Sequence, residues 1–368
     1  MSNSLKHPVR TEVQTFKPYS PGLSIEEIKK KYNLSRVIKM ASNENPLGAS
    51  PMVQEVISQN ASMVFRYPRA NNPELCRSVA GFLDLDAASI VCGNGSDELI
   101  DLLIRLLAVP GQDNIAAFKP CFSIYRLQAM LSGVEFRQAR LNNDFSFAWD
   151  ELKDIVDEQT RLVFLTNPDN PSGYAATAGE IIQFCAGLPE GSFLVVDEAY
   201  VDFADPVEEY SVLPFWKKTP NLIILRTFSK MYGLAGLRLG YAVLPEILAD
   251  YLRRIRLPFS VNILADMAGQ AALEDQDFVR KTRSVNFEGR AYLSAGLKDL
   301  GCEVYPSQTN FLMFDPPGNA AEIFDALLHQ GVIIRPLDSY GFNDLLRVSI
   351  GTAEENRLFI QCMREIIS

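Results

Sequence analysis

The chain has 368 residues, of which 47% are hydrophobic, so it can bury a large core and has the length of two or three domains. The formal net charge of −10 argues against a nucleic-acid partner, because neutralising phosphates requires clustered lysine and arginine residues that this sequence does not show. Residues 1–10 contain no apolar signal core, and no apolar run has the length of a transmembrane span, so we expect no membrane partner.

Cysteine and histidine residues are few and scattered. The six cysteines form no Cys-x-x-Cys pair and have no histidines nearby, so we expect neither a metal site nor a disulfide framework. Scattered reduced thiols are typical of a cytoplasmic protein. The two histidines are His7 and His329, so acid–base chemistry must be done by another group, such as a lysine.

The first part of the chain, residues 1–50, is predicted to contain little regular structure. Residues 17–22 are extended and rich in proline, a short helix opens at Ser24, and residues 37–40 form a short strand. The loop that follows, residues 41–48, carries many side-chain amides. Ordinary turn chemistry and the wall of a binding site explain this loop equally well.

A helix over about residues 51–60 comes next. It leads to an irregular loop, residues 66–73, in which Tyr67 stands between cations and prolines.

A glycine turn, residues 93–98, joins a strand at residues 89–92 to a strongly apolar helix that runs through Leu107. A helix start of this kind leaves free N–H groups and a positive dipole end, which suits a phosphate. Glu98 replaces the third glycine of a dinucleotide fingerprint, and no phosphate-binding Gly-x-x-x-x-Gly-Lys loop occurs. By itself the motif favours a plainer interpretation, a helix start capped by Asn94 or a neighbouring serine.

Two short apolar strands are followed by residues that could contact a cofactor. The strand at 115–118 precedes Phe122, whose ring could stack on a flat cofactor, although an aromatic there is more often core. The strand at 162–166 ends at two prolines that present Asn170 at the sheet edge, where its amide can donate to a phenolate oxygen.

A carboxylate, Asp197, directly follows the apolar strand 193–196. Burial of a carboxylate is costly unless it meets a cation or a metal. Asp197 is therefore a candidate functional residue.

The apolar run 221–225 is predicted to be a buried parallel strand, which places Lys230 just past its carboxyl end. Open α/β sheets bind ligands there. Thr227 and Ser229 precede the lysine and Arg238 follows it, so hydroxyls and a cation can converge on an anion beside a nucleophilic amine. Pyridoxal phosphate needs such an arrangement, although a lone Ser-Lys pair is more often a solvated surface feature.

The rest of the chain alternates strands and helices around one long helical stretch. This stretch, residues 262–299, would bridge two domains. The other elements that we expect are strands at 241–244, 304–314, 332–335 and 345–350, and helices at about 320–330 and from 354 onward.

Three motifs resemble the aspartate-aminotransferase superfamily of pyridoxal-phosphate enzymes, in the same order and at suitable spacings. They are Asn-Pro-x-Asn-Pro-Ser-Gly at 167–173, Asp-Glu-Ala-Tyr at 197–200, and Ser-Lys at 229–230 with Arg238. Other stretches resemble the histidinol-phosphate aminotransferase family within it, and the resemblance covers essentially the whole chain. These stretches lie at 41–48, 66–68, 93–98, 197–203 and 346–351.

The resemblance implies an α/β protein of fold type I. A large pyridoxal-phosphate-binding domain, residues 51–260, would hold a mostly parallel seven-stranded sheet flanked by helices. Residues 1–50 would join a small α+β domain made from both chain ends, and residues 261–368 would supply the interdomain helix and the rest of that domain.

Carried over residue by residue, the resemblance makes Lys230 the Schiff-base lysine and, once freed, the catalytic base. Asp197 would pair with the pyridine nitrogen, while Tyr200 and Asn170 would hold the 3′-oxygen. Phe122 would stack on the ring, at a position that is usually tyrosine in the family. The phosphate would be bound by Gly95, Ser96, Thr227, Ser229, Arg238 and, from a second subunit of a homodimer, Tyr67.

The implied reaction is transamination of L-histidinol phosphate with 2-oxoglutarate, in histidine biosynthesis. Arg347, flanked by apolar residues, would bind the substrate anion, and Arg335, Tyr19 and Asn43 would complete the pocket, although Arg335 could equally form a surface salt bridge. An aromatic-amino-acid aminotransferase would share Arg347 and the whole cofactor site. A pyridoxal-phosphate decarboxylase acting on a phosphate substrate is the third alternative.

Overall fold

The structure is a computed structural model that describes residues 9–14 and 24–367. Tyr19 and His7 lie outside the described residues. No helix in the described part combines the length and the apolar character that crossing a bilayer requires.

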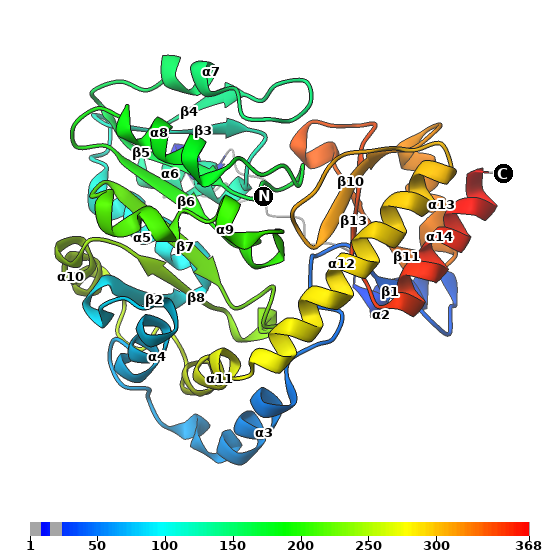
Figure 1. Cartoon of the computed structure of the whole chain (residues 1–368), viewed down its shortest axis with the longest axis horizontal. Helices are drawn as coiled ribbons and strands as arrows, with labels where there is room; N and C mark the ends of the chain where they lie inside the picture. The colour runs from blue at the N-terminus through cyan, green and yellow to red at the C-terminus, as the bar shows by residue number, and fades with distance from the viewer. Residues whose placement is uncertain (1–8, 15–23, 368) are drawn as a thin grey trace, which may run out of the picture.

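A seven-stranded sheet forms the centre of the larger part of the molecule (Figure 1). Its strands all run parallel except β8, which pairs antiparallel with both β2 and β7. The mostly parallel seven-stranded sheet expected from the sequence is thus confirmed. In spatial order the strands are β2 (Ile90–Asn94), β8 (Leu239–Val243), β7 (Leu222–Thr227), β6 (Phe193–Asp197), β5 (Thr160–Thr166), β3 (Asn114–Lys119) and β4 (Glu135–Arg140).

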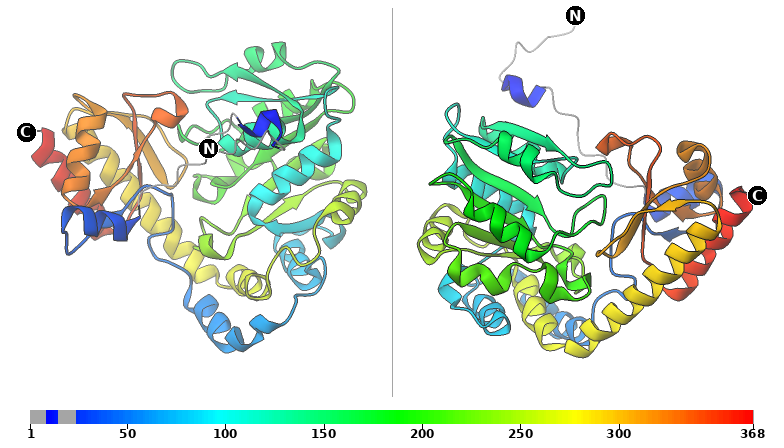
Figure 2. Two further views of the ribbon diagram at one scale, coloured as in Figure 1. Left: turned by 180° about the vertical axis from the view of Figure 1, so that it is seen from behind. Right: turned by 45° about the horizontal axis from the view of Figure 1, so that its top comes forward.

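Helices cover both faces of this sheet, which explains why its central strands are continuously apolar (Figure 2). Along β6, Val195 packs into the core on one face, whereas Leu194 and Val196 pack into the core on the other. The first core includes α5 (Gly95–Leu107), α6 (Ser123–Ser132) and α10 (Glu246–Ile255). The second includes α4 (Pro73–Leu83), α7 (Trp149–Asp154), α8 (Ala178–Ala186) and α11 (Ile263–Glu274). The short helix α9 (Val207–Tyr210) and the outlying α3 (Pro51–Asn60) and η1 (Ala61–Phe65) complete this part.

The smaller part combines residues from both ends of the described chain. An antiparallel sheet, in the order β12-β13-β10-β9, packs with α12, α13 and α14, while β1 pairs parallel with β11. Its elements are α2 (Ile25–Tyr32), β1 (Ile38–Lys39), α12 (Gln276–Asp299), β9 (Glu303–Val304), β10 (Phe311–Asp315), α13 (Ala320–His329), β11 (Val332–Ile333), β12 (Arg335–Pro336), β13 (Leu346–Ser349) and α14 (Ala353–Ile367). The helix α1 (Thr11–Gln14) is a single turn near the larger part, and the other described helices are the short 3-10 turns η2 (Ala87–Ser89), η3 (Val201–Phe203), η4 (Leu213–Lys218), η5 (Ala235–Leu237) and η6 (Asp338–Tyr340).

Two predicted elements are divided in the structure. The stretch 262–299 forms two helices, α11 and α12, because Asp275 leaves the helical conformation and its carboxylate accepts a hydrogen bond from the Phe278 N–H at 3.1 Å. The stretch 304–314 forms β9 and β10 with a loop between them, in which Thr309 and Ser307 bond to each other and to nearby backbone groups. Side-chain bonds of this kind compete with the strand ladder.

The turn after Lys230 depends on Gly233. This residue has φ +68°, and a Cβ added to it would lie 2.0 Å from the carbonyl oxygen of Gly48. The loop 41–48 and the lysine turn therefore touch backbone to backbone, and a side chain cannot enter between them.

We expect Gly233→Ala to destabilise the fold by about 2–4 kcal/mol, from left-handed strain together with the overlap with Gly48. Differential scanning calorimetry would show this as a lower melting temperature. Gly236→Ala is the matched control, because a Cβ at Gly236 meets nothing within 4 Å, and it should melt close to the wild-type protein. A Gly233→Ala protein as stable as that control would contradict the expectation.

Candidate active site

The predicted chemical residues gather where β5, β6 and β7 end. Asp197 is the last residue of β6 and lies opposite Thr166, the last residue of β5. Lys230 follows the end of β7 by three residues. This is the carboxyl edge of a parallel sheet, where open α/β folds bind ligands.

The amine of Lys230 has a lower pKa than that of an ordinary lysine. Its Nζ donates to the carbonyl oxygen of Ser42 at 3.1 Å and lies 5.8 Å from the centre of the Tyr200 ring. Burial, and then the positive charges of Arg347 and Arg238, lower the pKa of Lys230 to about 8. This favours the neutral, nucleophilic form.

Asp197 is 3% exposed, and its recorded hydrogen-bond partners are neutral. One oxygen accepts from the Ala199 N–H at 3.1 Å and the other from the Tyr125 hydroxyl at 3.0 Å. Burial raises the pKa of this carboxyl to about 6. A buried carboxylate with neutral partners is suited to receive a cationic ligand group.

Two hydrogen-bonded groups lie in this part of the site, one around Asn43 and Tyr200 and one around Arg347 and Asn170. The Asn43 amide donates to the Tyr200 hydroxyl at 3.1 Å, and its own oxygen accepts from Ser349 at 2.9 Å. Arg347 donates to the side-chain oxygen of Asn170 and, at 3.1 Å, to the carbonyl oxygen of Ala41. The bond from Arg347 turns the NH₂ group of Asn170 away, so this group is left to donate to a ligand.

A second group of predicted residues surrounds the start of α5. Its first residues are Gly95 and Ser96, and the preceding Asn94 makes no side-chain capping bond, so the structure does not show the Asn94 cap that the bare motif favoured. Arg238 approaches so closely that a Cβ on Gly95 would lie 2.7 Å from its Nη2. The side chain of Arg238 donates to Asp97 at 3.1 Å and to Ser229 at 3.5 Å.

The hydroxyl of Thr227 organises the loop beside this helix start. It accepts from the Ser229 N–H at 3.1 Å and donates to the carbonyl oxygen of Leu239 at 3.3 Å. Arg238 and Ser229 thus lie near the helix start at Gly95, where free backbone N–H groups, a hydroxyl and a guanidinium together could receive a phosphate.

Arg347 and Arg335 face each other across two antiparallel strands, because they are directly paired in the register of β12 and β13. Like charges in this position repel each other. Arg347 is 5% exposed, its Nε has no partner in the described structure, and the ion pairs recorded there do not include it. Arg335 is half-buried and donates to Ser339 at 3.5 Å. An anion between the two would relieve the repulsion.

Two aromatic residues that sequence reasoning selected have different surroundings. Phe122 precedes α6 and packs edge-on against Tyr125, with ring centroids 5.8 Å apart. Tyr67 is 81% exposed and stacks on Phe259 with centroids 4.8 Å apart. Within the described residues, the Tyr67 ring therefore contacts Phe259 and not the residues around Lys230.

Sequence reasoning missed a buried ion pair next to Asp197. Glu198 accepts from Arg226 on β7 at 2.7 and 2.9 Å, and also from the Val212 N–H at 2.7 Å. A charged residue inside the apolar strand 222–227 was the available signal. Sequence reasoning also missed Tyr125, since one tyrosine in an amphipathic helix carries no such signal.

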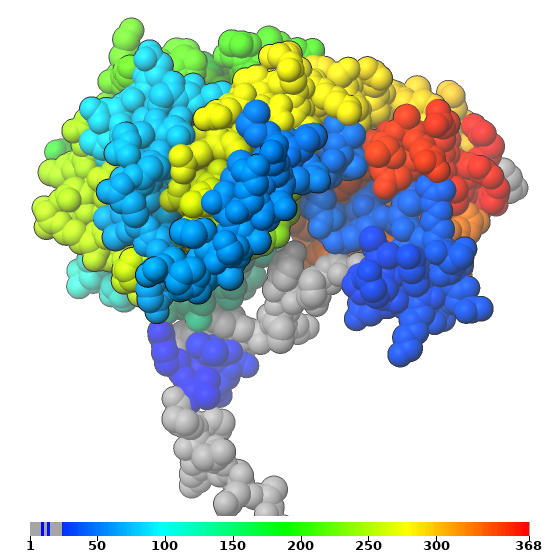
Figure 3. Space-filling model, turned by 90° about the horizontal axis from the view of Figure 1, so that it is seen from below, coloured from blue at the N-terminus to red at the C-terminus, as the bar shows by residue number. Residues whose placement is uncertain are grey.

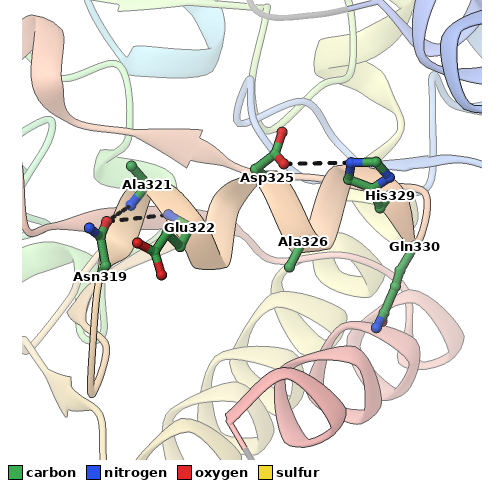
Figure 4. A pocket seen from close by; sticks show the side chains of 7 residues that line it. All are labelled: Asn319, Ala321, Glu322, Asp325, Ala326, His329 and Gln330. Carbon is green, nitrogen blue, oxygen red and sulfur yellow. Dashed lines mark hydrogen bonds and ion pairs between the residues drawn. The ribbon is translucent and has the colours of Figure 1, made fainter.

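One hollow in the surface lies apart from the predicted site residues. A hollow along the outer side of α13, shown in Figure 4, is lined by Asn319, Ala321, Glu322, Asp325, Ala326, His329 and Gln330. None of the predicted site residues lines it. Across residues 9–14 and 24–367, no group of three histidine, cysteine, aspartate or glutamate side chains could hold a metal ion.

Comparisons with known proteins identify the family of the chain. The family model described as aminotransferase class I and II matches residues 35–362. A histidinol-phosphate aminotransferase of Nitratidesulfovibrio vulgaris (strain Hildenborough) is 54% identical over 366 residues, covering 100% of this chain and 98% of the relative. One of Oleidesulfovibrio alaskensis is also 54% identical, over 98% and 95% of the two chains.

A solved structure extends the similarity to the fold. The crystal structure of histidinol-phosphate aminotransferase from Sinorhizobium meliloti in complex with pyridoxal-5′-phosphate superposes with a TM-score of 0.88. The two proteins share 28% identity, and the match covers 100% of this chain and 99% of that one.

We expect Lys230 of the cofactor-free protein to titrate near pH 8, so its reaction with cyanate should rise through that pH. Peptide mass spectrometry after timed carbamylation would measure this. Arg347→Met should move the midpoint up toward the ordinary value, because a repelling charge is removed. Arg335→Met, which removes a charge of the same kind from the neighbouring strand, should leave it nearly unchanged. A wild-type midpoint near 10.5 would show that the site does not depress this pKa.

Proposed function

The chain belongs to the aminotransferase class I and II family, and from this we propose that it transfers the amino group of L-histidinol phosphate to 2-oxoglutarate. The products would be imidazole-acetol phosphate and L-glutamate, in histidine biosynthesis. The protein is a pyridoxal-phosphate-dependent aminotransferase. The observation that carries the choice of substrate is 54% identity, over nearly its full length, to a curated histidinol-phosphate aminotransferase.

The residues present fit the cofactor. The helix start at Gly95 and Ser96 with Arg238 offers donors for its phosphate, and Asp197 offers a buried carboxylate for its ring nitrogen. A Cβ on Gly240 would lie 2.7 Å from the Ser96 N–H nitrogen, so the cradle leaves no room for a side chain there. Pyridoxal phosphate, when bound, supplies a carbonyl that takes the amino group and a ring that withdraws electrons.

Each residue of the site has a task that its chemistry allows. With a pKa of about 8, roughly a tenth of the Lys230 amine is neutral at pH 7, compared with about 0.03% at the ordinary value. Lys230 can therefore attack a carbonyl and later carry a proton as a general base. Tyr200 and Asn170 hold the ring oxygen, and Asp197 holds the ring nitrogen in its protonated form.

The substrate pocket is an anion site built around Arg347. Both substrates of the reaction carry an anion, a phosphate in histidinol phosphate and carboxylates in 2-oxoglutarate, and a guanidinium binds either one through two parallel hydrogen bonds. The free Nε of Arg347 and the opposed Arg335 support this role. Asn43 closes the pocket through its bond to Tyr200. We retain Tyr19, from outside the described residues, as a further member of this pocket.

We also propose that the enzyme works in the cytoplasm as a homodimer, with Tyr67 reaching the phosphate site of the partner. The described cysteines are all free, as is usual in the cytoplasm. The surface around Tyr67 carries several exposed apolar side chains, and α3 and η1 form part of the face seen in Figure 3. Its exposed apolar residues are Val64, Phe65, Tyr67, Leu257 and Phe259. A second copy of the chain would cover this surface, because apolar patches of this kind commonly mark protein interfaces.

Substrate preference tests the proposed reaction. With 2-oxoglutarate as acceptor, kcat/KM for histidinol phosphate should exceed the values for phenylalanine and tyrosine. If either aromatic acid is preferred by more than about tenfold, a difference near 1.4 kcal/mol, the enzyme is an aromatic-amino-acid aminotransferase. Release of carbon dioxide without glutamate turnover would identify a decarboxylase.

The shared anion pocket is tested by Arg347→Ala. Both half-reactions should fall by about 100-fold or more, because a buried charge pair is lost, while the cofactor stays bound. Arg335→Ala, at the more exposed of the two positions, should have a smaller effect. Full activity of Arg347→Ala with glutamate would contradict the shared pocket.

Hybrid dimers test the role of Tyr67. Lys230→Ala and Tyr67→Ala subunits should each be impaired alone, when assayed at low cofactor concentration. If Tyr67 serves the partner's site, random mixing by co-expression leaves about a quarter of the sites intact and restores activity. If Tyr67 served its own subunit, every site would keep a defect and mixing would restore nothing. A protein that is monomeric by light scattering and fully active in the same solution would contradict the dimer itself.

A further inference from the structure

Tyr125 stands behind Asp197 on the side of the sheet covered by α6. Its side chain is 1% exposed, and its ring stacks on Phe164 of β5 with centroids 4.6 Å apart. The hydroxyl lies 3.0 Å from Oδ2 of Asp197 and 2.9 Å from Oγ1 of Thr166. The phenol therefore touches the ends of two adjacent strands at the edge of the site.

The direction of these hydrogen bonds follows from the charge of Asp197. An ionised carboxylate only accepts, so the Tyr125 hydroxyl must donate its proton to Asp197. The same oxygen can then accept from the Thr166 hydroxyl. A hydrogen bond to an ionised acceptor is roughly twice as strong as a neutral one, and it weakens when the carboxylate takes up a proton.

From this contact we infer that Tyr125 is a positioning residue that keeps the Asp197 carboxylate ionised and aimed at the ring nitrogen of the cofactor. The inference rests on the cofactor assignment of the proposed function. Thr166 supports the phenol by donating to its oxygen, which leaves the phenol's own proton for Asp197.

The charges around Asp197 explain why the carboxylate needs this donor. Burial raises its pKa most, and the negative charges of Asp97 on α5 and of the adjacent Glu198 raise it further. The bond from Tyr125 is the largest influence in the opposite direction, ahead of the Ala199 N–H. Further titratable groups near this cluster are Tyr200, beside Asp197, Cys121, beside Tyr125, and Lys230, whose charge acts on Asp97.

Tyr125→Phe tests the inference, since it removes only the hydroxyl. The dissociation constant of pyridoxal phosphate would be measured by titrating the cofactor-free protein from pH 5 to pH 9. Protonation of Lys230, near pH 8, and protonation of Asp197, at lower pH, each weaken binding, so the acid-side midpoint that reports Asp197 is the lower of the two. In Tyr125→Phe the acid-side midpoint should move up by roughly one pH unit, because the carboxyl now binds its proton more tightly.

The control is Tyr241→Phe, at a buried tyrosine whose hydroxyl faces Arg226. Its midpoint should equal that of the wild-type protein. An equal loss of affinity at every pH in Tyr125→Phe, without a shift of the midpoint, would mean that Tyr125 acts only through packing and would overturn the inference. Failure of the wild-type protein to bind the cofactor would instead overturn the proposed function.

Thr166→Val is a second variant that keeps the phenol in place. It removes the donor to the phenol oxygen and should shift the midpoint in the same direction by a smaller amount. If Tyr125→Phe does not fold, as judged by circular dichroism, this variant decides the question. A Thr166→Val midpoint identical to that of the wild-type protein would then overturn the inference.

Discussion

The site depends on the buried ion pair between Glu198 and Arg226. These residues lie on neighbouring strand ends, one directly after Asp197 and the other four residues before Lys230. Removing two charges from water is costly, and the pair recovers that cost through two close contacts, a bond from Arg226 to Ser211 and a bond from the Val212 N–H to Glu198. The pair adds a side-chain link to the backbone ladder that joins β6 to β7, and Asp197 and Lys230 lie at or just past the ends of these two strands.

The rest of the site places several positive charges near the ends of β6 and β7. Arg238 and Arg347 both disfavour a proton on Lys230, and Arg335 opposes Arg347 across two strands. Without bound anions this arrangement costs stability, because repulsion between the cations is only partly offset by Asp97 and Glu44. The same repulsion becomes binding free energy when a phosphate or a carboxylate enters. The folded protein without ligand thus carries unfavourable electrostatic energy that anion binding relieves.

Much of the fold, and the place of the candidate site in it, could be predicted from the sequence, because apolar strands that stop at polar residues identify the carboxyl edge of a parallel sheet. Asp197, Asn170 and Lys230 all follow such strands. The opposed arginines are different, since their pairing depends on the antiparallel register of β12 and β13, which no local pattern specifies. Tyr125 lies on a helix and reaches Asp197 only through the packing of α6 on the sheet. The edge strand β4 was also missed, because its residues Glu135–Arg140 include only two apolar residues, Phe136 and Ala139, and neither an apolar run nor a regular alternation.

The pairing of β1 with β11 affects the order in which the chain can fold while it is being synthesised. Residues 38 and 39 emerge early, but their partners, residues 332 and 333, and Ser349, which holds Asn43, are made near the end of synthesis. The strands that carry Asp197 and Lys230 are complete long before that, and domains generally fold as their residues emerge. Residues 38, 39 and 43, on the amino-terminal side of the candidate pocket, therefore lack these partners until most of the polypeptide has been translated. A nascent chain can form the lysine edge of its sheet well before it can close the pocket around a substrate.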